Sequence, residues 1–257
     1  FVMTDRYANG DSSNDNGGLK AGAYEAGFDP SDHGMFHGGD FKGLTNSLDR
    51  IKKLGFTSIW VTPPVKQQFV QGNSAAYHGY WGIDFTTVDP HLGSEVDFKE
   101  LVAQAHKLNM KVIIDVVVNH TADVIYYDNS GRPQVSAAEA NIKKPEWLNL
   151  ISNYHNLGNN PRVGNSVLDG DFFGLDDLET ENPKVISGCI DVWSNWITKF
   201  DIDGMRIDTF KHVNPEFWKA FVPKMQAAAI AAGKKDFPIF GEASDTDAQS
   251  LSTYVAG

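Results

Sequence analysis

Charged residues interrupt a segment, 204–212 (GMRIDTFKH), that otherwise has the apolar pattern of a buried strand. Charged side chains are rarely buried unless they are paired or used in chemistry. Because side chains alternate along a strand, Arg206 and Asp208 share one face and the apolar residues share the other. Arg206 should stabilise the carboxylate of Asp208 and lower its pKa, which suits a nucleophile. The alternative is an ion pair that only orders the end of the strand.

A second carboxyl group, that of Glu242, follows the next strand-like run, PIFGEAS at 238–244. Neighbouring strands lie about 4.8 Å apart, so carboxyl groups at their ends can stand roughly 5 Å apart, the separation found in retaining glycosidases. Glu242 has no cation beside it in the sequence. We therefore predict that Glu242 is the protonated acid and Asp208 the ionised nucleophile.

Short apolar runs alternate with amphipathic helical patterns along the chain. This alternation predicts a parallel α/β architecture, either a doubly wound sheet or a (β/α)8 barrel. No G-x-G-x-x-G motif follows the first run, which argues against a dinucleotide-binding fold. The expected strands are 1–6, 58–64, 111–120, 204–210 and 238–244, and the expected helices are 43–55, 94–109, 183–200 and 214–233.

Polar residues stand at the expected carboxyl ends of the strands, where TIM-type barrels carry their chemistry. These residues are Asp5, Arg6, His120, Asp208 and Glu242. Their placement favours the barrel over the doubly wound sheet.

The barrel is predicted to comprise residues 1–120 and 183–257, with a loop-rich insertion at 121–182 after the third strand. Only strands 1 to 5 are present by this segmentation. Five parallel strands leave an open edge. We therefore expect the chain to be a piece of a longer protein and to be inactive by itself.

Composition excludes several classes of partner. The net charge is −11 with no basic cluster, which argues against nucleic-acid binding. No apolar run approaches the length of a membrane span. The single cysteine, Cys189, excludes an internal disulfide. The oligomeric state is not determined by the sequence.

Four motifs resemble those of the α-amylase family, glycoside hydrolase family 13, and occur in the family's order: AYHGYWGIDF (76–85), DVVVNH (115–120), GMRIDTFKH (204–212) and GEAS (241–244). The resemblance implies a retaining glycosidase that cleaves α-1,4-glucosidic bonds in starch-like glucans through a covalent intermediate. Asp208 would be the nucleophile, Glu242 the general acid/base and Arg206 the residue that holds the nucleophile. The implied sugar-binding residues are His78, Tyr80, Trp81, His120, Lys211 and His212.

One catalytic element of the family is missing from the chain. The family has a third catalytic carboxylate, an Asp that follows a His on a later strand. No such pair occurs after His212.

The loop NGDSSND (9–15) concentrates oxygen ligands at a close spacing that suits Ca²⁺. The alternative is a polar turn whose side chains cap their own backbone. The loop resembles a calcium site of cyclodextrin glucanotransferases and related amylases. That resemblance implies Asn9, Asp11, Asn14, Asp15, Gly38 and Asp40 as the calcium set. A second calcium typical of the family implies Asn119, Asp177 and the backbone carbonyl of His212, and would join the insertion to the barrel.

The motifs leave the outcome of the reaction open. The same intermediate serves hydrolysis and transglycosylation of the cyclodextrin glucanotransferase type, and pullulan- and cyclomaltodextrin-cleaving relatives share the motifs. A non-catalytic glucan-binding member is the alternative from another class, but it should have lost the nucleophile or the acid. Secretion is expected from the polymeric substrate and the use of calcium.

Overall fold

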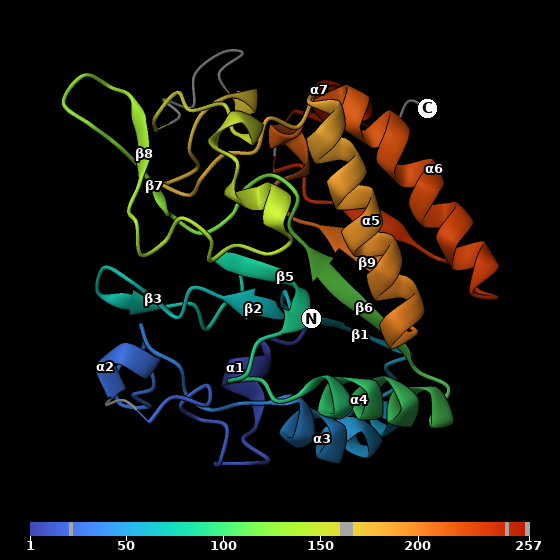
Figure 1. Ribbon diagram of the computed structural model, residues 1–257. Coiled ribbons are helices and arrows are strands. Elements are labelled where there is room, and N and C mark those ends of the chain that lie inside the picture. Colours follow the sequence, from blue (N-terminus) through green and yellow to red (C-terminus); the bar gives the residue numbers. More distant parts are fainter. Residues whose placement is uncertain (21–22, 160–166, 245–246, 255–257) are drawn as a thin grey trace.

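A parallel sheet runs through the computed structural model, which describes residues 1–20, 23–159, 167–244 and 247–254 (Figure 1). The described strands of this sheet stand in the order β1-β6-β9-β10, and every neighbouring pair is parallel. Their bounds are β1 (Ser58–Val61), β6 (Lys111–Val116), β9 (Gly204–Ile207) and β10 (Ile239–Gly241). At the β1 edge, Val2 adds a parallel bridge to Val61. The predicted parallel α/β order of strands is therefore confirmed.

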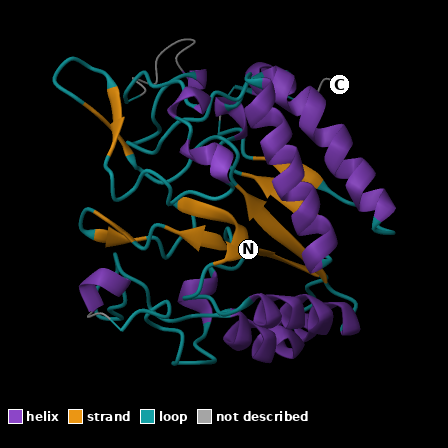
Figure 2. Ribbon diagram, in the orientation of Figure 1, coloured by secondary structure: helices purple, strands orange, loops and turns teal. Residues whose placement is uncertain are grey.

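Long helices pack along one side of this sheet, while loops and short antiparallel strand pairs lie on the other side (Figure 2). They are α3 (Phe41–Lys53), α4 (Glu95–Lys107), α5 (Pro183–Phe200) and α6 (Pro215–Ala231). Each begins where the sequence supplies a start signal. Asp40 accepts a hydrogen bond from the Gly43 amide of α3, and Ser94 and Asp97 form a capping box at α4.

The remaining elements are short. Antiparallel pairs form between β2 (Val65–Gln67) and β5 (Gly82–Val88), between β3 (Val70–Gln71) and β4 (Ser74–Ala75), and between β7 (Ile125–Tyr127) and β8 (Pro133–Val135). Among the described residues, the other helical segments include α1 (Thr4–Tyr7), α2 (Ala23–Ala26), α7 (Ala248–Ser252) and 3₁₀ turns at Glu146–Asn149, Ile151–Asn153 and Phe210–His212. No described helix is both long and apolar enough to cross a bilayer.

The prediction of a strand over 1–6 is wrong beyond its second residue. Val2 exchanges backbone hydrogen bonds with Trp60 and Thr62. The chain then turns into α1, because the buried carboxylate of Asp5 accepts hydrogen bonds from two backbone amides of another loop. The strand expected over 58–64 ends at Val61, since the prolines that follow have no N–H to donate.

The insertion does not form a separate, weakly cored unit. Its apolar side chains Leu148, Tyr154 and Leu178 belong to the same buried cluster as the sheet and its helices. Inside it, the ammonium group of buried Lys143 pairs with the carboxylate of buried Asp176 and also donates to the Tyr154 hydroxyl. The insertion therefore packs against the same buried core as the sheet and its helices.

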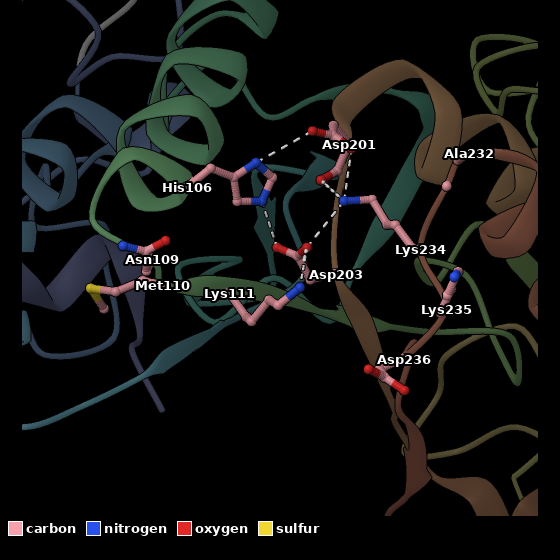
Figure 3. Close-up of a pocket in the computed structure, with 11 residues that line it drawn as sticks. His106, Asn109, Met110, Lys111, Asp201, Asp203, Ala232, Lys234, Lys235 and Asp236 are labelled. Carbon is pink, nitrogen blue, oxygen red and sulfur yellow. Dashed lines mark hydrogen bonds and ion pairs between the residues drawn. The ribbon is translucent and has the colours of Figure 1, made fainter.

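A cavity of about 500 Å³ lies at the amino ends of β6 and β9, and its charged side chains neutralise one another (Figure 3). The His106 ring lies between two carboxylates, 3.3 Å from Asp201 and 2.7 Å from Asp203. Lys234 contacts the same pair at 2.7 and 3.0 Å. Asp203 also accepts the Val112 amide, so this network joins α4 and β6 to the segments that precede β9 and follow α6. We interpret the network as structural, because it lies at the amino ends of the strands, whereas the chemistry of TIM-type barrels is carried at the carboxyl ends.

Candidate active site

The predicted acid and nucleophile stand at the carboxyl ends of neighbouring parallel strands. Asp208 directly follows β9 and Glu242 directly follows β10. Gly241 is paired with Ile207, and the Glu242 amide donates to the Ile207 carbonyl at 2.8 Å. The two carboxyl groups therefore share one edge of the sheet, as the sequence predicted.

One guanidinium group binds both carboxylates. Arg206 Nη1 lies 2.8 Å from Asp208 Oδ1, and Nη2 lies 2.9 Å from Glu242 Oε2. The Arg206 and Asp208 side chains are only 8% and 9% exposed, so water screens their contact weakly, whereas Glu242 is 43% exposed. Glu242 has no cation beside it in the sequence, but in the fold Arg206 reaches it from the neighbouring strand.

Burial raises the pKa of Asp208 to about 7. The negative charge of Asp115 raises it further, while Arg206 lowers it and Glu242 raises it. The prediction of a lowered pKa is therefore wrong. The desolvation of this carboxylate outweighs the attraction of its arginine partner. Asp208 is consequently poised between its neutral and ionised forms near neutral pH.

Sequence reasoning missed Asp115, which is fully buried beneath the two carboxyl groups. It pairs in register with Arg206 across β6 and β9, and it accepts Arg206 Nη1 at 2.7 Å. It also accepts the Tyr80 hydroxyl at 3.0 Å and the Trp60 indole N–H at 3.1 Å. The sequence did contain a signal for Asp115, because it is a single carboxylate inside the apolar run KVIIDVVV. A buried charge there requires a partner or a chemical role, as it does at Arg206.

The predicted sugar-binding aromatic residues gather beside Asp115. The His78 and Tyr80 rings stack with their centroids 5.6 Å apart, and the Trp81 ring meets His78 edge-on at 4.8 Å. His120 Nε2 donates to the Tyr80 carbonyl at 3.2 Å. Burial lowers the pKa of both His78 and His120 to about 4, so both rings are neutral at neutral pH. Neutral imidazoles suit hydrogen bonding to uncharged hydroxyl groups.

The two remaining predicted sugar-binding residues lie in the 3₁₀ turn after the nucleophile. Lys211 Nζ donates to the Ser244 carbonyl at 2.5 Å, which ties this turn to the loop after β10. His212 Nδ1 donates to the Val167 carbonyl at 2.8 Å. The centroid of the Phe172 ring lies 6.0 Å from that of His120 and 4.9 Å from that of His212. The histidines thus meet around one ring, whereas the role of Lys211 in sugar binding stays a prediction.

The first predicted calcium set converges in the structure, with one exception. Asn9 and Asp15 meet at 2.7 Å, and both press against Gly38, where an added Cβ would lie 2.6 Å from each. Within the described residues, the buried Asn14 Oδ1 has no hydrogen-bond partner. Asp40 accepts the Asn14 amide group. A cluster of oxygens with one unsatisfied acceptor fits a hard cation.

Asp11 is the exception in this set. Its carboxylate accepts hydrogen bonds from Ser13 and from Lys42 Nζ, which lower its pKa to about 2. Burial and the charges of Asp40 and Asp11 raise the pKa of Asp15, so a bound cation would favour the ionised form of Asp15.

The second predicted calcium set is also partly assembled. A β-bridge joins His120 to Asp177, and the Leu178 amide donates to the Asn119 carbonyl. Asn119 Oδ1 is buried and has no partner among the described residues, which suits a ligand of a cation. Asp177 Oδ2 already accepts His155 Nδ1 at 2.5 Å. No group of three or more His, Cys, Asp or Glu side chains is arranged for metal binding in the described ranges, so both sets depend on amide or carbonyl oxygens.

Comparison with known proteins decides the family. The family model "Alpha amylase, catalytic domain" matches residues 1–257. The chain belongs to the α-amylase family. It is 42% identical to the α-amylase of Streptomyces lividans over 89% of this chain and 30% of that protein. It is 33% identical to the cyclomaltodextrin glucanotransferase of Klebsiella oxytoca, over 94% and 37% of the two chains.

Solved members of the family share the fold. The Anoxybacillus α-amylase superposes with a TM-score of 0.76 and 37% identity over 99% of this chain and 48% of its own. The α/β, TIM-type fold class is therefore confirmed. The chain spans 30% to 48% of the length of these relatives.

Proposed function

We propose that this α-amylase family member is a retaining glycoside hydrolase that cleaves α-1,4-glucosidic bonds in starch-like glucans. The observation that carries the proposal is the binding of Asp208 and Glu242, at neighbouring strand ends, to the two amino nitrogens of one arginine. Two carboxyl groups so close can work as nucleophile and acid/base on one glycosidic bond. The sheet and its helices would form the first five strand positions of a (β/α)8 barrel.

The contacts divide the work between the two carboxyl groups. Asp208 attacks the anomeric carbon while Glu242 protonates the leaving oxygen, and Glu242 then deprotonates the water that releases the sugar. Both donors to Glu242, the Arg206 Nη2 and the Thr209 amide, bind Oε2. The proton for the leaving group is therefore carried on Oε1. Asp115 holds Arg206 from below and keeps its guanidinium aimed at both groups.

The relatives support the substrate class and the setting. The α-amylase of Geobacillus thermoleovorans was solved with acarbose, and the Escherichia coli relative is a periplasmic α-amylase. We infer a glucan substrate and an extracytoplasmic location on the same grounds. Calcium held by Asn9, Asn14, Asp15 and Asp40, and by a second set that includes Asn119, would supply charge that stabilises the loops around the site.

The test is substitution of the acid. Glu242→Gln keeps the shape and the hydrogen bonds of the side chain but cannot deliver a proton. In the intact protein, we expect turnover of soluble starch to fall by about 10²–10⁴-fold while maltoheptaose still binds. Glu216→Gln, at an exposed position at the start of α6, is the matched control and should keep wild-type turnover. Unchanged turnover in the Glu242 variant would refute the assignment of Glu242 as the general acid/base. NMR of the first-formed anomer reports retention or inversion directly.

A transglycosylase is the second candidate, favoured by the similarity to the Klebsiella oxytoca enzyme and by the loop at 9–15. Chromatography of the products from soluble starch separates the two. Linear oligosaccharides support the hydrolase, and cyclic products support the transglycosylase. Loss of either activity on adding a chelator, with recovery on adding Ca²⁺, would support the calcium sets.

A further inference from the structure

The pair Asp5 and Arg6 was singled out by the sequence but has no part in the proposed reaction. Asp5 is 1% exposed, and its carboxylate accepts the His37 amide at 2.9 Å and the Gly38 amide at 3.1 Å. Arg6 Nε lies 2.9 Å from the same carboxylate. The pair is therefore built into the loop at 33–38 and not into the sheet.

The guanidinium of Arg6 binds this loop at three points. Nη2 donates to the carbonyls of His33 and Met35, each at 2.8 Å. Nη1 lies 2.7 Å from His37 Nε2, which also lies 3.0 Å from the Asp32 carbonyl. The planar fork of an arginine reaches several acceptors in fixed directions, and a lysine ammonium cannot replace that arrangement.

The face of the same guanidinium covers the ring of Tyr77, with its central carbon 3.8 Å from the ring centroid. Tyr77 contacts the next residue, His78, edge-on at 5.1 Å, and His78 stacks on Tyr80. The backbones of the two segments are also joined, because the Ala75 amide donates to the Gly34 carbonyl at 2.8 Å. Arg6 thus connects the 33–38 loop to the segment that carries the predicted sugar-binding rings.

We propose that Arg6 is a positioning residue for the segment 76–81. Its hydrogen bonds hold the loop at 33–38. The face of its guanidinium group packs on the Tyr77 ring and so fixes the position of the adjacent His78, which would contact the sugar. A cation over an aromatic face attracts the ring, and this attraction favours one conformation of a short loop. The role of Arg6 in sugar binding rests on the proposed function. Its role as a brace, which is the connection that it makes between the loop at 33–38 and the segment 76–81, does not.

The test compares Arg6→Gln with Arg6→Lys, Tyr77→Phe and Tyr77→Leu in the intact protein. Hydrogen exchange without sugar should speed up about tenfold at both 33–38 and 76–81 in Arg6→Gln. Arg6→Lys should loosen 33–38 more than 76–81, because a cation still covers the ring. Tyr77→Phe should resemble the wild type, since it keeps the ring, and Tyr77→Leu should loosen 76–81. Arg50→Gln, at an exposed position on α3, is the matched control.

The kinetic readout separates positioning from general destabilisation. The Arg6→Gln and Tyr77→Leu variants should raise the KM for maltoheptaose about fivefold while kcat changes less than twofold. Faster exchange at 33–38 with wild-type exchange at 76–81 would overturn the proposal. So would a uniform loss of protection that includes β6. If Arg6→Gln does not fold, wild-type exchange at 76–81 in Tyr77→Leu would overturn it. A wild-type protein that binds no glucan would refute the proposed function, while the exchange data would still decide whether Arg6 is a brace.

Discussion

Replacing the nucleophile by its amide, Asp208→Asn, should stabilise the folded protein at pH 8. Asp208 has a pKa of about 7 in the fold, against 3.8 for a free side chain. At about 1.4 kcal/mol per pKa unit, keeping this group ionised costs the fold about 4 kcal/mol above pH 7. An amide resembles the neutral acid, so the variant avoids this cost. The pKa of about 7 already includes the attraction of Arg206, so we expect a net gain of about 4 kcal/mol at pH 8.

The sign of the pH dependence follows from the raised pKa. The folded state binds this proton more tightly than the unfolded state does. The stabilising contribution of protonated Asp208 is therefore complete below about pH 4 and is lost as the pH rises to about 7. The difference between variant and wild type should be near zero at pH 4 and reach its full size at pH 8.

The assay is urea unfolding followed by tryptophan fluorescence at pH 4, 6 and 8, since the chain has six Trp residues. Asp191→Asn, at an exposed position on α5, is the control and should change stability by less than about 0.5 kcal/mol. Equal destabilisation by Asp208→Asn at all three pH values would refute the reasoning. It would mean that the attraction of Arg206, and not burial, dominates the energy of this carboxylate.

Two further predictions concern parts of the fold away from the reaction. Asp203→Asn should cost about 2–3 kcal/mol at pH 7. Burial opposes ionisation of Asp203, but contacts with Val112, His106 and Lys234 outweigh burial and lower its pKa. The cost of the substitution should therefore shrink as the pH falls through that pKa. Urea unfolding at several pH values measures this cost. Gly17→Ala should lower the melting temperature more than Gly18→Ala. Both glycines have positive φ, but a Cβ on residue 17 would lie 2.3 Å from the His91 ring, whereas a Cβ on residue 18 would have open space. Calorimetry measures the melting temperatures, and equal decreases in the two variants would contradict the expected clash.

Local patterns along the chain were enough to predict the architecture and most of the chemistry-bearing residues. Buried parallel strands are continuous apolar runs, and helices have their own period and caps, so both are visible locally. The charged pair in GMRIDTF and the acid in GEAS stood out because charge inside an apolar run needs a reason. Boundaries were weaker, as at 1–6, where a buried Asp5 carboxylate turned the chain into a helix. The seven-residue β5 was missed because its pairing partner is a strand of only three residues.

The electrostatics of the site, by contrast, emerged only when the chain was folded. The sequence placed one arginine beside Asp208, but the fold brought that arginine to Asp115 and Glu242 as well. It also buried Asp208 deeply enough to raise the pKa that its neighbour alone would lower. A pKa depends on solvent exposure and on all charges within a few ångströms, and neither is encoded in the order of residues along one strand. The strand pattern therefore names the residues, and their packing sets how they ionise.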